Sequence, residues 1–378
     1  MNKKECIAFY ISSHGFGHLT RSLALIEYLL QHTSYYIYLC SGELQISYAK
    51  IYLHKYANRV CYSVQKTDVG LINKENSLCV NLETTNSEVK KLLNSYPQIA
   101  ELEAEKLKFC NVVLIVSDIS ALAFLVGKNL SVKTIGIANF TWVDQYLGIG
   151  ADEEIIQKMK ELYSLGYYYI KYDLSLAFSG APQKRTEESN FIVSRPVLKS
   201  RVHEIREQCK MLYAKKTGLE RFPEILLLTL GQSANLPPIR LTNFKGVVLY
   251  TQGVSINEDS QKNYILQKIP YNVEDTQSYI AAADMVVSKA GWSSVAEALV
   301  AHRYLFLIER EGVDDDTNTI ETLCSRRLAV KLKQNELKEL NYTLLKERAA
   351  TLIQTDKLYT IKNDTKHLCN KIIDLINK

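Results

Sequence analysis

The sequence predicts an α/β protein built from two doubly wound parallel-sheet domains that face each other across a cleft. Short, apolar, β-rich runs alternate with helical patterns over most of the 378 residues, as they do when parallel strands are covered by helices on both faces. The alternation lapses in a polar, charged stretch and then begins again. A chain of this length also exceeds what one hydrophobic core usually serves, so two domains are expected.

The first domain is predicted over residues 1–190. Its expected strands are short and nearly all apolar, at 6–11, 36–40, 112–117 and 133–137. Apolar residues at helical spacing predict helices between them, over 20–31 and 87–108. The aromatic-rich run YSLGYYYIKYD (163–173) is interpreted as core and interface packing in preference to a sugar-stacking platform.

The polar stretch at 191–223 is predicted to be a linker, and residues 224–360 to form the second domain. Strands of that domain are expected at 224–231, 246–250, 284–291 and 304–309. Residues 361–378 are expected to form a helix that packs back on the first domain. Because ligands of such sheets bind at the carboxyl ends of the strands, the site is expected between the two domains.

Composition limits the class of partner. The chain is 47% hydrophobic and 23% charged, with a formal net charge of +5 and no basic tract interleaved with aromatics. Nucleic-acid binding is therefore not expected, and membrane contact is expected to be peripheral at most. The eight cysteines lack metal-ligand spacing and are interpreted as buried free thiols in a reducing compartment. The apolar window 109–127 is long enough to be considered as a membrane span, but Asp118 at its centre indicates a strand followed by a helix. No signal peptide is recognised, and a cytoplasmic location is expected.

The turn after the first predicted strand carries HGFGH, residues 14–18. Its glycines let a ligand approach the backbone, and the next helix directs N–H groups at that ligand. The dinucleotide fingerprint is incomplete here. A histidine at this turn is placed to take a proton from a bound group, although the spacing alone leaves open whether it only caps the helix. His14 is expected to shape the turn.

A carboxylate closes the strand predicted at 112–117. Asp118 in VSDIS is expected on the same sheet edge as His18, where it can orient the imidazole. It is also a suitable N-cap for a helix beginning near Ser120, and the two interpretations are compatible.

The third strand-to-helix turn is SKAGWSSVAEAL, within 283–299. Gly291, Ser293 and Ser294 open a helix whose positive end suits a diphosphate. Glu297 lies about one turn further on, where it can accept hydrogen bonds from two ribose hydroxyls. In the acidic segment EGVDDDTN (311–318), Asp316 is interpreted as part of a solvated loop.

These segments in combination resemble those of known enzymes. SKAGWSSVAEAL followed by LFLIEREGVDDDTN resembles the donor-binding signature of GT-B glycosyltransferases, closest to the branch with the N-acetylglucosaminyltransferase that forms lipid II. The N-terminal half is similar to the glycosyltransferase-like domain of L-arabinokinases. There, HGFGHLTR, DVGLINKENSL (68–78), VSDISALAF and IANFTW (137–142) follow in the same order.

The resemblance implies a role for each matching residue. His18 falls on the general base of inverting relatives, and Asp118 on the aspartate that supports it. Gly291, Ser293 and Ser294 fall on the diphosphate-binding turn, and Glu297 on the ribose-binding glutamate. The remaining donor-binding positions are Gly17 in the first turn, Gly231 and Ser233 after the first strand of the second domain, Asn272 and Val273 at a uracil edge, and Asp314 or Asp315 with Asn318 at the sugar.

The implied function is an inverting, metal-independent glycosyltransferase of the hexosyl or N-acetylhexosaminyl class. Its donor substrate would be a UDP-sugar, with no further cofactor, and its acceptor a saccharide, a lipid-linked sugar or a natural product. The loop LGQSAN and the turn HRY (302–304) depart from the family pattern. Three alternatives remain open: an epimerase, a non-catalytic nucleotide-sugar-binding protein, and a nucleotide-sugar hydrolase. GFGHLTRSLAL resembles the opening of the nucleotide-sugar hydrolase of pseudaminic acid synthesis.

Overall fold

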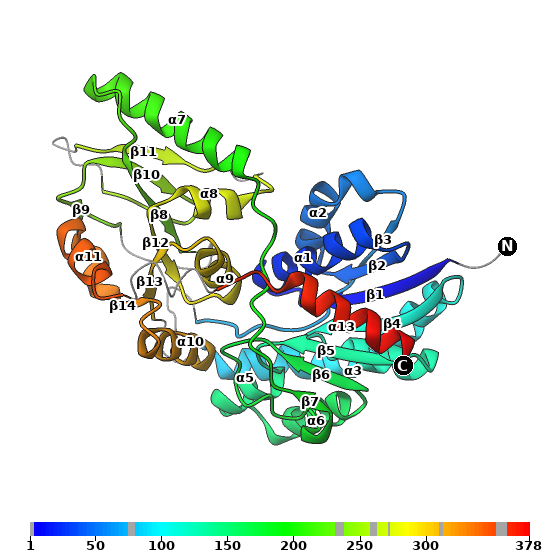
Figure 1. The fold of residues 1–378 in the computed structure, drawn as a ribbon. Coiled ribbons are helices and arrows are strands. Elements are labelled where there is room, and N and C mark those ends of the chain that lie inside the picture. Colours follow the sequence, from blue (N-terminus) through cyan, green and yellow to red (C-terminus); the bar gives the residue numbers. More distant parts are fainter. Residues whose placement is uncertain are drawn as a thin grey trace.

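Two parallel β-sheets flanked by helices form the computed structural model of the chain (Figure 1). The structure describes the following residues: 4–74, 80–230, 238–257, 263–270, 273–309, 313–352 and 361–378.

The first sheet has seven strands in the order β3-β2-β1-β4-β5-β6-β7, all paired in parallel. The strands are β1 (Glu5–Ile11), β2 (Tyr36–Ser41), β3 (Val60–Val64), β4 (Asn111–Asp118), β5 (Thr134–Ala138), β6 (Tyr168–Lys171) and β7 (Thr186–Glu187). The helices of this part are α1 (Gly17–His32), α2 (Glu43–Tyr52), α3 (Leu82–Leu107), α4 (Leu122–Leu130), α5 (Trp142–Gly148) and α6 (Glu153–Ser164), with 3₁₀ turns η1 (His54–Tyr56) and η2 (Gln183–Arg185). The order changes direction at β1 and β4, so this pair marks the topological switch point where open α/β sheets bind ligands.

The second sheet has six parallel strands in the order β11-β10-β8-β12-β13-β14. They are β8 (Glu224–Thr229), β10 (Gly246–Tyr250), β11 (Ile265–Lys268), β12 (Met285–Lys289), β13 (Tyr304–Ile308) and β14 (Val330–Leu332). A small parallel pair joins β9 (Leu241–Thr242) to β15 (Leu340–Asn341). The helices are α7 (Lys199–Thr217), α8 (Thr276–Ala282), α9 (Trp292–Val300), α10 (Asp314–Ser325), α11 (Tyr342–Ala349) and α13 (Thr365–Asn377), with the 3₁₀ turn η3 (Gln334–Glu339).

Burial on both faces explains why the central strands are apolar throughout. In β1, Ile7, Phe9 and Ile11 belong to one hydrophobic cluster, whereas Ala8 and Tyr10 belong to the cluster on the opposite face. Successive side chains of a strand point to opposite faces, so a strand covered on both sides needs apolar residues at both sets of positions. The predicted doubly wound fold is therefore confirmed.

The chain crosses between the two sheets twice, and the crossings lie side by side. The Asp364 amide donates to the Ile192 carbonyl over 2.8 Å, and the Ile192 amide donates to Asp364 Oδ2 over 3.1 Å. The stretch predicted as a linker, 191–223, contains the 19-residue helix α7. After the return crossing, α13 lies along α1 of the first sheet (Figure 1), and the Cys369 thiol lies 3.5 Å from the Leu25 carbonyl.

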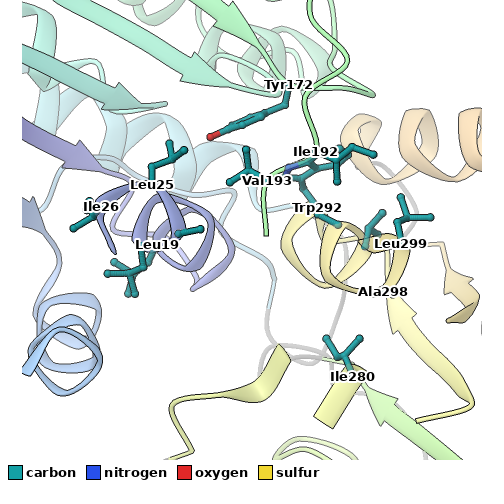
Figure 2. Close-up of a cluster of buried hydrophobic side chains, with 14 of the residues drawn as sticks. Leu19, Leu25, Ile26, Tyr172, Ile192, Val193, Ile280, Trp292, Ala298 and Leu299 are labelled. Carbon is teal, nitrogen blue, oxygen red and sulfur yellow. The ribbon is translucent and has the colours of Figure 1, made fainter. Parts of the chain in front are cut away.

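A hydrophobic contact joins the two halves where α1 meets α9 (Figure 2). The rings of Tyr172 and Trp292, from opposite sides of this contact, have centroids 6.2 Å apart. Both side chains are buried and belong to the hydrophobic cluster that also contains Leu19 of α1 and Val193 of the first crossing. Fully burying one such side chain contributes roughly 1.5–3 kcal/mol, so these residues hold the halves in contact.

The described cysteines are all free, but they are not all buried. Cys6, Cys40, Cys209 and Cys369 are buried, whereas Cys61 is exposed, which corrects the expectation of uniformly buried thiols. Among the helices described here, none combines the length and the apolar character needed to cross a bilayer.

Candidate active site at the contact between the two sheets

The turn after β1 presents His18 on the first turn of α1. Gly15 has φ +68°, in the left-handed region that favours glycine. The His18 ring does not cap the helix, because its Nδ1 lies 2.9 Å from Asp118 Oδ1. Phe140 packs edge-on against the imidazole, with ring centroids 5.7 Å apart.

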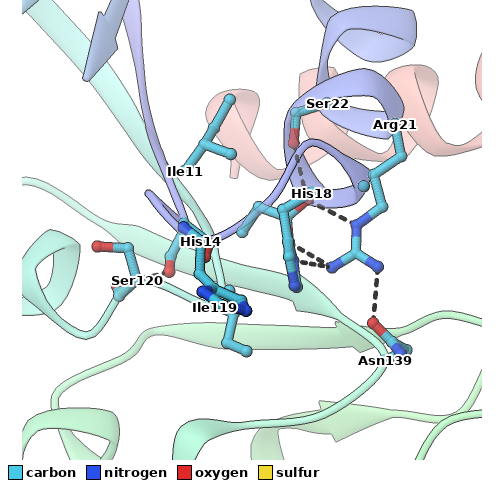
Figure 3. A network of polar contacts seen from close by, with 12 residues as sticks. Ile11, His14, His18, Arg21, Ser22, Ile119, Ser120 and Asn139 are labelled. Atoms are coloured by element: carbon cyan, nitrogen blue, oxygen red, sulfur yellow. Dashed lines mark hydrogen bonds and ion pairs between the residues drawn. The ribbon is translucent and has the colours of Figure 1, made fainter. Parts of the chain in front are cut away.

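Asp118 is the last residue of β4 and lies beside Ile11 of β1 in the sheet register. It is 2% exposed, and four donor contacts converge on its carboxylate: His18 Nδ1, Arg21 Nε at 2.7 Å, Arg21 Nη2, and Ser22 Oγ at 2.8 Å (Figure 3). Burial alone would raise the pKa of this carboxyl, but Arg21 and His18 outweigh it and lower the pKa to about 2. Helix α4 begins only at Leu122. Asp118 therefore faces His18 and Arg21 rather than capping α4.

Arg21 completes this cluster and extends it toward the second sheet. Its Nη2 lies 2.7 Å from His18 Nδ1, and its Nη1 donates to Asn139 Oδ1 over 2.6 Å. The guanidinium also lies over the Tyr172 ring, 4.9 Å from its centroid. Burial opposes the charge of Arg21, but the neighbouring Asp118 raises its pKa, so the side chain remains a cation.

His14 lies apart from this carboxylate cluster. Its ring packs against Gly70 and stands at 76° to the Trp142 ring, 6.4 Å away. Asp68 connects the turn to Trp142, because it accepts hydrogen bonds from the Ser13 amide and from Trp142 Nε1, each over 2.9 Å. Asp68 and Gly70, Trp142 of IANFTW and the turn after β1 thus meet in space, and the role of His14 in shaping this turn stays a prediction.

The second sheet contributes the start of α9 to the same place. Gly291 precedes this helix, and Ser293 Oγ lies 2.5 Å from Thr20 Oγ1 of α1. A Cβ built on Gly17 would lie 3.8 Å from Ser293 Cβ. The first turns of α1 and α9 therefore meet, and each supplies the positive end of a helix dipole. Ser294, next along α9, is partly buried.

Glu297 is held by an arginine that the sequence did not single out. Its Oε1 accepts from Arg195 Nε over 3.0 Å and from Arg195 Nη2 over 2.9 Å. Arg195 is 1% exposed and also donates to Tyr48 Oη, the Glu274 carbonyl and Thr276 Oγ1. Any ribose contact of Glu297 therefore has to share this carboxylate with Arg195.

The acidic run is helical rather than a loop. Asp314, Asp315 and Asp316 form the first turn of α10, where carboxylates complement the helix dipole. Asp316 is fully buried, so its interpretation as part of a solvated loop is wrong. Asp315 Oδ1 accepts from Asn139 Nδ2 over 2.8 Å, which joins it to the Arg21 cluster. The exposed Asp314 lies against Gly148.

Two of the remaining predicted donor-binding residues form hydrogen bonds within the protein. Asn318 Nδ2 donates to the Leu174 carbonyl over 2.8 Å. The partly buried Val273 donates its amide to the Pro270 carbonyl over 3.3 Å. Gly231, Ser233 and Asn272 lie outside the described residues. Within the described part of the chain, no group of three or more His, Cys, Asp or Glu side chains is arranged to hold a metal ion.

All of the clustered polar residues follow carboxyl ends of parallel strands. His18 follows β1, Asp118 ends β4, Asn139 follows β5, Ser293 follows β12 and Asp315 follows β13. Two parallel-sheet α/β domains that meet in this way define a GT-B fold. In agreement, residues 233–368 match the glycosyltransferase family 28 C-terminal domain.

Comparison with solved structures gives the same fold over the whole chain. UGT89C1 of Arabidopsis thaliana, solved with UDP-L-rhamnose, superposes with a TM-score of 0.63 at 10% identity, covering 100% of both chains. The calicheamicin glycosyltransferase CalG4 gives 0.62 at 12% identity, covering 100% of this chain and 99% of that one. SnogD, a glycosyltransferase of Streptomyces nogalater, gives 0.58 at 12% identity, covering 99% and 100%.

A curated relative resembles nearly the whole chain. The L-arabinokinase of Arabidopsis thaliana is 21% identical over 358 residues, which are 93% of this chain. The chain spans only 32% of that protein's length, about a third.

Sequence reasoning missed Arg21, Asn139 and Arg195. Arg21 and Asn139 stand inside the motifs HGFGHLTR and IANFTW, but a motif does not show which of its side chains meet across 118 residues of chain. Arg195 follows a polar stretch without a recognisable pattern, so only the fold reveals its partners.

Proposed function

We propose that the chain is an inverting glycosyltransferase that moves a sugar from a UDP-sugar to an acceptor hydroxyl. The observation that carries the proposal is the 2.9 Å contact between His18 Nδ1 and Asp118 Oδ1, a short distance along α1 from the contact with Ser293. An imidazole held at Nδ1 by a buried carboxylate can accept a proton at Nε2, as in a catalytic triad.

In the proposed reaction, His18 Nε2 takes the proton of the acceptor hydroxyl while that oxygen bonds to the anomeric carbon of the donor. The bond between the anomeric carbon and the diphosphate oxygen breaks, its electron pair leaves with UDP, and the configuration at carbon inverts. Asp118 stabilises the imidazolium. The first turn of α9, with Gly291, Ser293 and Ser294, would bind the departing diphosphate, which is electrostatic work on developing charge.

The donor assignment draws on the comparisons. The family match lies in the half of the chain that contains α9 and α10, and UGT89C1 is solved with UDP-L-rhamnose and, separately, with quercetin. We propose UDP as the nucleotide, a hexosyl or N-acetylhexosaminyl group as the sugar, and contacts to that sugar from Asp314 or Asp315 with Asn318. Glu297 would read the ribose, and turnover would need neither a metal nor another cofactor.

The proposed acceptor is a saccharide, a lipid-linked sugar or a natural product. We propose that the protein acts in the cytoplasm, binds no nucleic acid and touches membranes at most peripherally, in keeping with its mild net charge.

A release assay tests the proposal. The protein is incubated with a panel of UDP-sugars, with and without pooled acceptors, and both UDP and free sugar are measured. Transfer predicts UDP release that depends on an acceptor. Rapid, stoichiometric release of sugar from donor alone would instead identify a hydrolase, and binding of donor without turnover would identify a binding protein.

Replacement of His18 tests the mechanism. His18→Ala should lower transfer by about 10² to 10⁴, with little change in UDP affinity, because the base contacts the acceptor. His14→Ala is the matched control on the same turn and should cost much less. Wild-type turnover in His18→Ala would refute the general-base assignment.

A further inference from the structure

The structure places a cation where a simple histidine–aspartate pair has none. Arg21 Nη2 lies 2.7 Å from His18 Nδ1, while the same guanidinium pairs with the Asp118 carboxylate on which that nitrogen depends. We propose that Arg21 is a positioning residue, which fixes Asp118 against His18 and offsets the negative charge that Asp118 presents to the imidazole. Through Asn139, Arg21 also connects this pair to Asp315 of the second sheet. The proposal rests on the proposed role of His18 as the base.

The shape of the guanidinium accounts for the positioning. Nε donates to Asp118 Oδ2 over 2.7 Å and Nη2 donates to Oδ1, so two nitrogens of the planar fork face two carboxylate oxygens. This pairing leaves Nη1 for Asn139. A lysine carries one point charge and cannot hold three partners in one plane.

The electrostatic part follows from burial. Arg21 and Asp118 are each 2% exposed, and His18 is partly buried. An unpaired buried carboxylate beside His18 would strongly favour the imidazolium, which has no free Nε2 lone pair and cannot act as a base. Arg21 cancels that charge locally. It also opposes the protonated ring directly, because the guanidinium and an imidazolium carry like charges at short range.

The groups around His18 show which charges matter. Asp118 faces it from β4, Arg21 faces it from the next turn of α1, and the Phe140 ring contributes no charge. Asp315 of α10 acts on Arg21 at longer range. Tyr172 contributes its ring face to the guanidinium. Arg21 is therefore the one cation among these described neighbours of the imidazole.

Asn139 extends the effect across the contact between the sheets. Its Oδ1 accepts from Arg21 Nη1 over 2.6 Å, and its Nδ2 donates to Asp315 Oδ1 over 2.8 Å. An amide has one acceptor end and one donor end, so it can join this cation to this anion in a single orientation. Asn139 is 1% exposed and Asp315 is 9% exposed. A shift of α10 against the first sheet would therefore move Arg21 and, with it, the base.

The test follows His18 itself by NMR, with labelled histidine and with His18→Gln to assign its signal. Arg21→Met should move the pH at which His18 is half protonated upward by about 1 unit or more, because the cation is lost while Asp118 remains. The acidic limb of the transfer rate should move by the same amount. Arg21→Lys should give a smaller upward shift.

The half-buried Arg201, which pairs with Asp275 and Glu204, provides a matched control, and Arg201→Met should leave His18 unchanged. An unchanged or lower midpoint in Arg21→Met would overturn the proposal. If that variant does not fold, Arg21→Lys decides, and a midpoint equal to that of the unmodified protein would overturn the proposal.

Asn139→Ala tests the connection to Asp315. It should leave the His18 midpoint in place but lower kcat by about 10-fold, the scale of one hydrogen bond to a charged group, with a smaller change in the donor KM. An unaltered kcat would refute the connection. The NMR titration needs no turnover, so a shifted midpoint in a protein without transfer would count against the proposed function and not against the role of Arg21.

Discussion

The ion pair between Arg195 and Glu297 gives the most decisive prediction for stability. The exposed fractions of the two side chains are 1% and 5%, and both contacts converge on one carboxylate oxygen. Burial disfavours the charge on Arg195, yet Glu297 raises the pKa of the guanidinium above its usual range. Glu297→Ala would therefore leave a buried cation without its counter-charge.

The magnitude follows from what Arg195 would retain. Breaking a buried ion pair from one side typically costs about 3–5 kcal/mol. Arg195 would keep Tyr48 Oη, the Glu274 carbonyl and Thr276 Oγ1 as acceptors. Because these polar contacts remain, we expect a loss near the lower end, about 3 kcal/mol in the free energy of unfolding.

Urea unfolding of the wild type and Glu297→Ala measures this loss directly. Glu154→Ala is the control, since Glu154 and its partner Lys158 are 59% and 43% exposed and such surface pairs contribute about 0–1 kcal/mol. Glu297→Gln keeps an acceptor and should fall between the two. A urea midpoint for Glu297→Ala that matches the wild type would show that Arg195 does not depend on Glu297, which would then be free for the ribose.

Three further predictions concern stability at low pH, activity without a metal ion, and the room around Gly17. Asp118 has a folded-state pKa of about 2 against an ordinary 3.8, so its ionised carboxylate stabilises the fold by about 2 kcal/mol above about pH 4. This contribution is lost as the pH falls toward 2, and circular dichroism should show that Asp118→Asn lacks this acid dependence. Transfer should continue in EDTA, because the helix end at Gly291 would take the place of a divalent cation; loss of turnover that manganese or magnesium restores would contradict this. Gly17→Ala should change the free energy of unfolding by no more than about 1 kcal/mol, since the new Cβ would meet Ser293 Cβ at an ordinary 3.8 Å. The same methyl group should weaken UDP binding measured by calorimetry, and unchanged affinity would place the diphosphate elsewhere.

The fold followed from the sequence wherever strands are buried on both faces. The expected strands at 6–11, 36–40, 112–117 and 133–137 correspond to β1, β2, β4 and β5, because short, β-branched apolar runs suit parallel strands that are covered on both faces. Strands near the sheet edges were missed. β11 (Ile265–Lys268) is partly or fully exposed along its length and carries no such run, so its sequence resembles that of a loop.

Single residues of the site could be predicted from the sequence, but the hydrogen bonds between them could not. Asp118 and His18 each stand at a recognisable strand end, and parallel topology brings those ends together. The partners of Glu297 and Asp315 belong to segments 102 and 176 residues away. The packing of the two halves decides which polar side chains meet when they are so far apart in the sequence. A local sequence pattern does not contain that information.

The return of the chain to the first sheet has a consequence for biosynthesis. Leu368, Cys369 and Ile372 of α13 complete the hydrophobic cluster that includes Leu25 of α1. During vectorial translation, α1 leaves the ribosome early, and its covering helix emerges only after the entire second sheet has been made. The second sheet is thus an insertion in the chain, and its host remains incomplete until α13 has been made. Nascent chains arrested before residue 365 lack α13 and should therefore expose the apolar face of α1 to chaperones.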